Sequence, residues 1–285
     1  MDRILFGDNQ FFGINHMSEE KARTQSMKFR NSDDIMKILD TAYDIGIRTF
    51  MCTTHDKIAE IANIVRQKPK RYSGFKFYPG MPYAYKYANA ITEEGLLGAL
   101  KKFGGLDIIR AAAKGGTALV TQDIIGIMKL LIDMEMKMFV GLSTDVIFLQ
   151  NVVVDLLLGL NLKKIFVEYS NYIKDKYKAE PGFITMNMPM LLDVLEDCGI
   201  NDPIICSSIN KIGFRMCGGK DLYEKTLRER KFHPVAMSIL ASGAINPEEA
   251  IQYVCGFKNI ESIVFGASSK SHILQTKELI ESNNT

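Results

Sequence analysis

The stretch Ser262–Ser269, which reads SIVFGASS, carries a β-branched and aromatic run into a glycine and a serine pair, and an amphipathic pattern from Lys270 to Ile280 follows at once. This order is typical of a strand joined to a helix by a tight turn. Such a turn places free backbone N–H groups and two hydroxyls at the helix start, where they can hold an anion such as a phosphate. An ordinary turn closed by a serine cap explains the same residues. The rest of the chain is therefore needed to interpret the stretch.

The same strand-then-helix unit recurs along the whole chain. Regular alternation predicts parallel strands with crossover helices, and no Pro/Gly/Ser-rich linker interrupts it. The predicted strands lie at residues 3–7, 48–52, 74–78, 106–110, 137–142, 163–169, 203–207, 234–239 and 262–265. Helical patterns between them include 33–44, 93–103, 121–134, 145–158 and 186–198. We therefore predict one α/β domain over residues 1–285, a (β/α)8 TIM barrel with one strand surplus.

A doubly wound open sheet is the rival architecture. It would carry a phosphate-binding Gly-x-Gly-x-x-Gly turn directly after the first strand. The residues Gly7, Asp8 and Asn9 stand there instead. The barrel is therefore the better prediction.

The composition is that of an ordinary globular protein, because 47% of the 285 residues are apolar and 24% are charged. A net charge of +2 gives no argument for nucleic acid or for an acidic membrane surface. The five cysteines show no C-x-x-C spacing, so we expect free thiols rather than a zinc or iron–sulfur site. The sequence shows neither a signal-peptide pattern nor an apolar run of about 20 residues. We expect a cytoplasmic protein.

Several short motifs, in order, resemble those of one enzyme family. Val140–Ser143 is similar to the end of the fifth strand of the aldo-keto reductases, and Phe166–Ser170 resembles their sixth strand. Phe265–Ser269 is similar to their cofactor-phosphate loop, and Gly243–Val254 resembles the stretch before it. The resemblance covers most of the chain and implies that family's TIM barrel with NADP as cofactor. The cofactor-binding residues that it implies are Ser143, Glu168, Asn171, Gly266, Ser268, Ser269 and Lys270.

The catalytic residues of that family are matched only in part. Its second strand ends in an aspartate followed by a tyrosine, and the corresponding Phe50–Asp56 does not have this pattern. Lys76 matches the third-strand lysine, whereas Arg110 stands in place of the fourth-strand histidine. Because the tyrosine proton donor is missing, the resemblance supports the fold better than it supports ketone reduction.

Site residues of a barrel come from the C-terminal ends of its strands and the loops that follow. Arginine and lysine there suit a small anionic substrate through charge-assisted hydrogen bonds, although solvation at the surface is their commoner fate. The catalytic candidates are Asp8, His16, His55, Lys76 and Arg110. The substrate-binding candidates are Asn9, Gln10, Phe12, Tyr78, Lys211 and Arg215.

The two histidines His16 and His55 admit three interpretations. They could form an acid/base pair tuned by the barrel mouth. With a carboxylate from Asp8, Asp56 or Glu168 they could hold a divalent metal. They could also merely hydrogen-bond the loop backbone. No His-x-x-x-His spacing supports the metal, so we assign no metal ligands.

Three functions remain open. The first is a divergent aldo-keto-reductase-like enzyme that uses acid/base chemistry on a small anionic substrate bearing a carbonyl or a phosphate. The second is an NADP-dependent oxidoreductase whose proton donor has moved to Tyr78 or His55. The third is a non-catalytic barrel used for binding or for assembly as a homo-oligomer. Its interface would be an apolar helix face formed by Ile124, Ile127, Met128 and Leu131. The same residues are equally explained by packing of the helix against the barrel.

Overall fold

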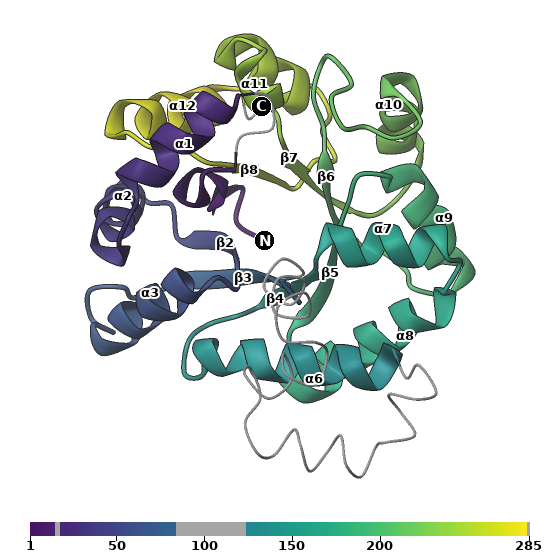
Figure 1. The fold of residues 1–285 in the computed structure, drawn as a ribbon. Coiled ribbons are helices and arrows are strands. Elements are labelled where there is room, and N and C mark those ends of the chain that lie inside the picture. The colour runs from purple at the N-terminus through teal and green to yellow at the C-terminus, as the bar shows by residue number, and fades with distance from the viewer. Residues whose placement is uncertain (15–17, 84–123, 284–285) are drawn as a thin grey trace.

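A computed structural model describes residues 1–14, 18–83 and 124–283. Its parallel strands pair in chain order, and β8 pairs with β1, so the sheet closes into a barrel. Helices form a ring around the strands (Figure 1). The closed parallel barrel predicted from the alternating pattern is thereby confirmed. The strands are β1 (Ile4–Gly7), β2 (Thr49–Thr53), β3 (Lys76–Met81), β4 (Val146–Leu149), β5 (Glu180–Thr185), β6 (Ile204–Ser208), β7 (His233–Met237) and β8 (Ser262–Phe265).

The helices pack their apolar faces on the barrel. In α2 the Asn31 side chain accepts a hydrogen bond from Asp34 N–H and caps the helix, which buries Ile35 and Leu39. The α-helices are α1 (Glu19–Lys28), α2 (Ser32–Asp44), α3 (Asp56–Gln67), α6 (Ile124–Met136), α7 (Asn151–Gly159), α8 (Lys163–Tyr172), α9 (Met188–Asp197), α10 (Lys220–Glu229), α11 (Pro247–Cys255) and α12 (Lys270–Ser282). Shorter helical segments are η1 (Asn9–Phe12), η2 (Lys137–Phe139), η3 (Ile173–Tyr177) and η4 (Ala241–Gly243). No helix within the described ranges is long and apolar enough to cross a membrane.

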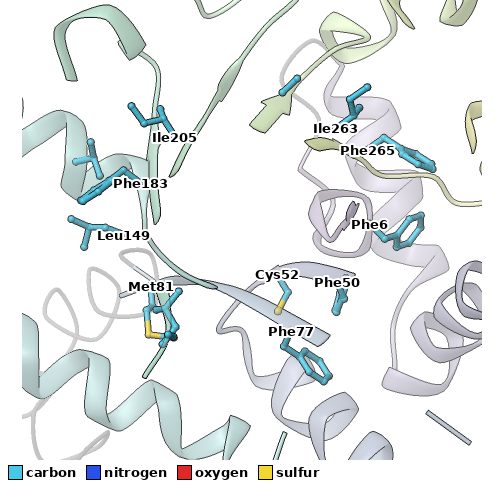
Figure 2. Packing of buried hydrophobic residues seen from close by; sticks show 14 of the residues in the cluster. Phe6, Phe50, Cys52, Phe77, Met81, Leu149, Phe183, Ile205, Ile263 and Phe265 are labelled. Carbon is cyan, nitrogen blue, oxygen red and sulfur yellow. The ribbon is translucent and has the colours of Figure 1, made fainter. Parts of the chain in front are cut away.

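Each strand contributes side chains to two apolar layers, because successive side chains point to opposite faces of the sheet. The inward side chains fill the barrel, and they include Leu5, Met51, Tyr78, Phe148, Cys206 and Val264. The outward side chains pack between barrel and helices (Figure 2), and they include Phe6, Phe50, Phe77, Leu149, Phe183 and Ile263. Both layers are buried, so the barrel is a packed core rather than a channel.

Two predicted strands are wrong. Residues 137–142 form η2 and a turn, and residues 163–169 lie within the helix α8. The apolar residues Ile165, Phe166 and Tyr169 recur at a spacing that suits a helix face, and all three are buried. The predicted strand at 106–110 and helix at 93–103 lie outside the described residues.

Two real strands were missed. All of β4 falls inside the helix predicted at 145–158, because the fully buried run Val146–Leu149 shows no alternation and is followed closely by the apolar helix α7. In β5, Pro181 and Gly182 break the strand pattern. Six predicted strands are confirmed as β1, β2, β3, β6, β7 and β8.

Gly182 gives a test of the barrel packing. It faces Phe148 across the β4–β5 pair, and a Cβ at this position would lie 2.5 Å from two ring carbons of Phe148. We expect Gly182→Ala to lower the free energy of unfolding by about 2 kcal/mol, because the ring cannot move within a full core. The melting temperature should fall by about 5 °C. Gly159→Ala is the matched control, because nothing lies within 4 Å of its Cβ position. Equal melting temperatures for the two variants would contradict this packing.

Candidate functional site

Asp8 is a buried carboxyl at the C-terminal end of β1. It is 6% exposed, and its Oδ2 accepts hydrogen bonds from both the N–H and the hydroxyl of Thr53, each at 2.7 Å. Burial raises the pKa of Asp8 to about 6, although the hydrogen bonds from Thr53 act to lower it. Gly7 and Thr53 beside it are partly exposed, so the carboxyl lies just beneath the surface of the mouth. A carboxyl that titrates near neutral pH can both give and take a proton.

His55, the second catalytic candidate in the described ranges, caps a helix. Its Nδ1 accepts a hydrogen bond from Lys57 N–H at 3.2 Å at the start of α3. Its ring stacks on Phe12 with centroids 4.3 Å apart and planes at 27°. His55 therefore has a structural role at the mouth, and its Nδ1 must be unprotonated to accept that bond. His16 and Arg110 lie outside the described residues, so their proposed roles stay predictions.

A second buried carboxylate, Glu135 of α6, links two strand ends. It is 2% exposed and accepts the Thr54 hydroxyl at 2.6 Å. It also accepts the Tyr83 N–H at 3.0 Å, just after β3. This role could not be predicted from the sequence, because Glu135 lies in an ordinary helical pattern and only the folded packing buries it. Its bonds tie the ends of β2 and β3 to α6.

Asp155 of α7 holds the C-terminal end of β5 in a similar way, by accepting hydrogen bonds. It accepts the Thr185 hydroxyl at 2.5 Å and lies within hydrogen-bond distance of Met186 N–H. Burial raises the pKa of Asp155 above its usual range. The mouth thus holds two described carboxyls with raised pKa, of which Asp8 is the more buried.

Gln10 and Gly266 bring the first and last strands together at the mouth. The Gln10 Nε2 donates to Gly7 O at 2.8 Å, and its Oε1 would lie 1.9 Å from a Cβ at position 266. Only glycine permits this approach. The neighbouring Ser269 caps α12 by accepting His272 N–H at 3.4 Å. Lys28 of α1 donates to Ser268 O at 2.6 Å, which adds a cation to this loop.

Two residues predicted for the mouth lie at the other end of the barrel. Lys76 is the first residue of β3, and its Nζ forms an ion pair with Asp145 Oδ2 at 2.9 Å. Ser143 precedes β4, and its hydroxyl donates to Asp145 Oδ1 at 2.7 Å. These side chains join the N-terminal ends of β3 and β4. The structure therefore gives no support to a catalytic Lys76 or a cofactor-binding Ser143 in the mouth.

Two further cofactor candidates lie on an outer helix. Glu168 of α8 forms an ion pair with Lys129 of α6 at 2.9 Å. Asn171 is exposed on the same helix. Both were assigned to the end of a strand that does not exist, because residues 163–172 are helical. They are thus removed from the mouth.

The substrate-binding candidates divide in a similar way. Tyr78 lies inside the barrel and is 1% exposed, so burial raises the pKa of its phenol and keeps it neutral. Asn9 is exposed in η1. Lys211 forms an ion pair with Glu249 at 2.5 Å. Arg215 is exposed and lies over the Phe214 ring. Phe12 stacks on His55, and Gln10 packs against Gly266. All the substrate-binding candidates except Tyr78 therefore lie in loops that follow strands.

A cluster of three His, Cys, Asp or Glu side chains able to hold a metal ion is not found in residues 1–14, 18–83 or 124–283. The arrangement that is found there offers a titratable carboxyl beside a hydroxyl. Such a carboxyl can give and take a proton.

Solved structures similar to this chain include aldo-keto reductases. A proposed aldo-keto reductase from Pseudomonas aeruginosa has a TM-score of 0.58 and 9% identity, covering 100% of this chain and 92% of its own. An aldo-keto reductase from Brucella melitensis has a TM-score of 0.53 and 8% identity, covering 100% and 94%. A mutant of Gox0644 in complex with NADPH has a TM-score of 0.52 and 9% identity, covering 98% and 83%.

No protein-family model and no curated protein matches the sequence. The fold is therefore a (β/α)8 barrel of the aldo-keto reductase type. Among the motifs that carried the resemblance, the loop Gly266–Ser269 stands directly between β8 and α12, whereas Val140–Ser143 and Phe166–Ser170 are not strands. The resemblance was correct for the fold although two of its motifs were misplaced.

Asp8→Asn tests whether the buried carboxyl opposes folding. Between its ordinary pKa of 3.8 and about 6, the folded chain holds a proton that the unfolded chain has lost. The free energy of unfolding should therefore fall by about 3 kcal/mol in total as the pH rises through this window. Asparagine keeps the acceptor for Thr53 without the charge. We expect Asp8→Asn to melt at a higher temperature than wild type at pH 7 and at a similar temperature near pH 4.

Thermal melts between pH 4 and 8 would measure this difference. Asp175→Asn, at an exposed site in η3, is the matched control and should leave the pH dependence unchanged. A lower melting temperature for Asp8→Asn at pH 7 would show that the carboxylate supports the fold.

Proposed function

We propose that the chain is an enzyme that transfers a proton to or from a small anionic substrate at the C-terminal mouth of its barrel, with Asp8 as the acid/base. The observation that carries this proposal is the buried Asp8, whose pKa is raised to about 6 at the end of a barrel strand. Raised pKa values of buried carboxyls concentrate at functional sites. The position is also the one where barrels carry their chemistry.

The geometry suits proton exchange at one oxygen of Asp8. Both bonds from Thr53 go to Oδ2, so Oδ1 is the oxygen that would exchange a proton with the substrate. Thr53 orients the carboxyl and holds the charged form by hydrogen bonding. Above about pH 6 Asp8 acts as a base, and below it as an acid.

An anionic substrate is favoured by the charge of the neighbouring loop. Lys28 reaches Ser268 O, and Lys270 is the first residue of α12. The N–H groups of that first turn carry partial positive charge. A carboxylate or phosphate on the substrate would be held there while its carbonyl faces Asp8. The substrate class is therefore a small carbonyl compound that bears an anionic group, or a phosphate ester.

Turnover of such compounds by wild type and variants tests the role of Asp8. We expect a panel of phosphorylated and carboxylated carbonyl compounds, assayed with and without NADPH, to contain a substrate. Asp8→Asn should lower kcat/KM by a factor of about 100 or more. Thr53→Val should shift the acid limb of the pH profile to higher pH, because one bond to the charged form is lost.

The same assay separates the alternatives. An Asp8→Asn variant with wild-type kcat/KM would contradict the acid/base assignment. Binding of the panel compounds without turnover would favour a non-catalytic barrel. The helix face proposed for assembly gives that alternative little support, because Met128 on this face is buried against the barrel.

An NADP-dependent oxidoreductase is the second candidate, favoured by the loop Gly266–Ser269 in the position that the family resemblance implies. One neighbour of the same fold is in complex with NADPH. Ser268, Ser269, Lys270 and Lys28 would hold a phosphate of the cofactor, which would supply a hydride. The cation of Lys28 on Ser268 O suits that phosphate, whereas the space beside Gly266 is filled by the Gln10 side chain. Tyr78 does not serve as the relocated proton donor, because it lies inside the barrel.

Calorimetric titration with NADPH and NADH tests this candidate. We expect micromolar binding of NADPH and weaker binding of NADH. Lys28→Gln and Lys270→Gln should each weaken NADPH binding by about tenfold, the effect of losing one charge-assisted contact. Lys258→Gln, an exposed lysine that precedes β8, is the control for the change in charge. Absence of NADPH binding would remove this candidate and leave the acid/base proposal standing.

A further inference from the structure

A cavity of about 440 Å³ opens at the end of the barrel opposite Asp8. Its walls come from the N-terminal ends of β1 and β3, from the turns before β2 and β3, and from the last turns of α12. Ile4 of β1 lines the cavity, and Asp8 follows the other end of the same strand. This face of a barrel ordinarily serves stability rather than catalysis. A cavity of this size can hold a small metabolite.

Four cationic side chains line this cavity, and the two lysines are already paired. Lys76 forms an ion pair with Asp145 at 2.9 Å, and Lys277 pairs with Glu281 at 2.5 Å. The other two are Arg3 and Arg48.

Neither arginine of the cavity wall has a carboxylate partner in the described part of the chain. Arg3 donates to the backbone oxygen of Ile260 and lies 3.6 Å from Cys255 Sγ. Arg48 donates to Tyr43 O, and its guanidinium lies 3.9 Å from the centre of the Tyr43 ring. A guanidinium has five N–H donors in a fork that matches a carboxylate or a phosphate. Most of these N–H donors have no hydrogen-bond acceptor among the described residues.

Arg3 also carries an unmet buried donor. Its Nε is buried and has no hydrogen-bond acceptor among the described residues. Such groups are uncommon in folded proteins and unfavourable by about 1–3 kcal/mol. Because this Nε is buried, it does not face the open cavity, and the charges that line the cavity are what favour a ligand. Four cationic side chains face two carboxylates, Asp2 and Glu281, and both arginines lack an acidic partner in the part of the chain that the structure describes, so an anion would complete the site.

We propose that this cavity binds a small organic anion bearing a phosphate or carboxylate group, which Arg3 and Arg48 hold by charge-assisted hydrogen bonds. Ile4, which is half-buried, is the apolar lining residue that would contact its carbon skeleton, because Ile47 and Ile280 are buried beneath the wall. The ligand differs in place from any substrate of the mouth, because the two sites lie at opposite ends of β1. Binding stabilises the folded barrel.

The test uses inorganic phosphate, pyrophosphate and citrate as probes, with potassium chloride at matched ionic strength as the reference. Isothermal calorimetry and thermal melts should show saturable binding to wild type with a dissociation constant below about 1 mM. Arg48→Gln should weaken that binding by about tenfold. Arg71→Gln is the matched control, because Arg71 also lies over the Tyr43 ring, at 4.9 Å, yet does not line the cavity. It should bind as wild type does.

Two further variants keep the outcome decisive. Lys277→Gln leaves both arginines in place and should weaken binding less than Arg48→Gln does. Asp8→Asn should bind the probes as wild type does, because the mouth is not involved. Tighter binding of pyrophosphate than of citrate would assign the anionic group as phosphate, and the reverse would assign it as carboxylate. No saturable binding of any probe, equal loss in Arg71→Gln and Arg48→Gln, or loss in Asp8→Asn would overturn the proposal.

Discussion

Pairing of β8 with β1 is the constraint on which the other features of this molecule depend. Once the parallel sheet closes, every strand must end on the same face, and loops distant in sequence meet there. Inward side chains then fill the interior, so that face becomes a shallow mouth over a solid core. The polar groups at this face are therefore those that the loops hold at the rim.

The rim is built from buried polar groups that serve two purposes. Glu135 and Asp155 each accept hydrogen bonds from a strand end and so fix the loops. Asp8 receives comparable bonds from Thr53, yet desolvation outweighs them and the pKa of its carboxyl rises to about 6. Burial raises the pKa of Asp155 as well, so Asp8 differs from it in being the more deeply buried of the two carboxyls. A buried carboxyl with a raised pKa is a candidate for proton transfer.

The sequence predicted the barrel because strand and helix patterns alternate regularly, and it located six strands and the turn before α12. It failed at β4 and α8, where apolar runs of similar length fit either a strand or a helix and only tertiary packing decides. Asp8, His55 and Gln10 could be placed at the mouth from their position after strands. The buried roles of Glu135 and Tyr78 could not, because burial depends on contacts between residues far apart in sequence.

The close approach of Gln10 to Gly266 has a consequence for how the chain acquires its site. Gln10 is made long before Gly266, the glycine against which it packs. Joining them closes a very long loop, a non-local step of the kind that slows folding. A nascent chain that lacks β8 would hold Asp8 in an open, solvated sheet edge. Its carboxyl would then keep an ordinary acidity, so the raised pKa of Asp8 would arise only once β8 has been made and has paired with β1.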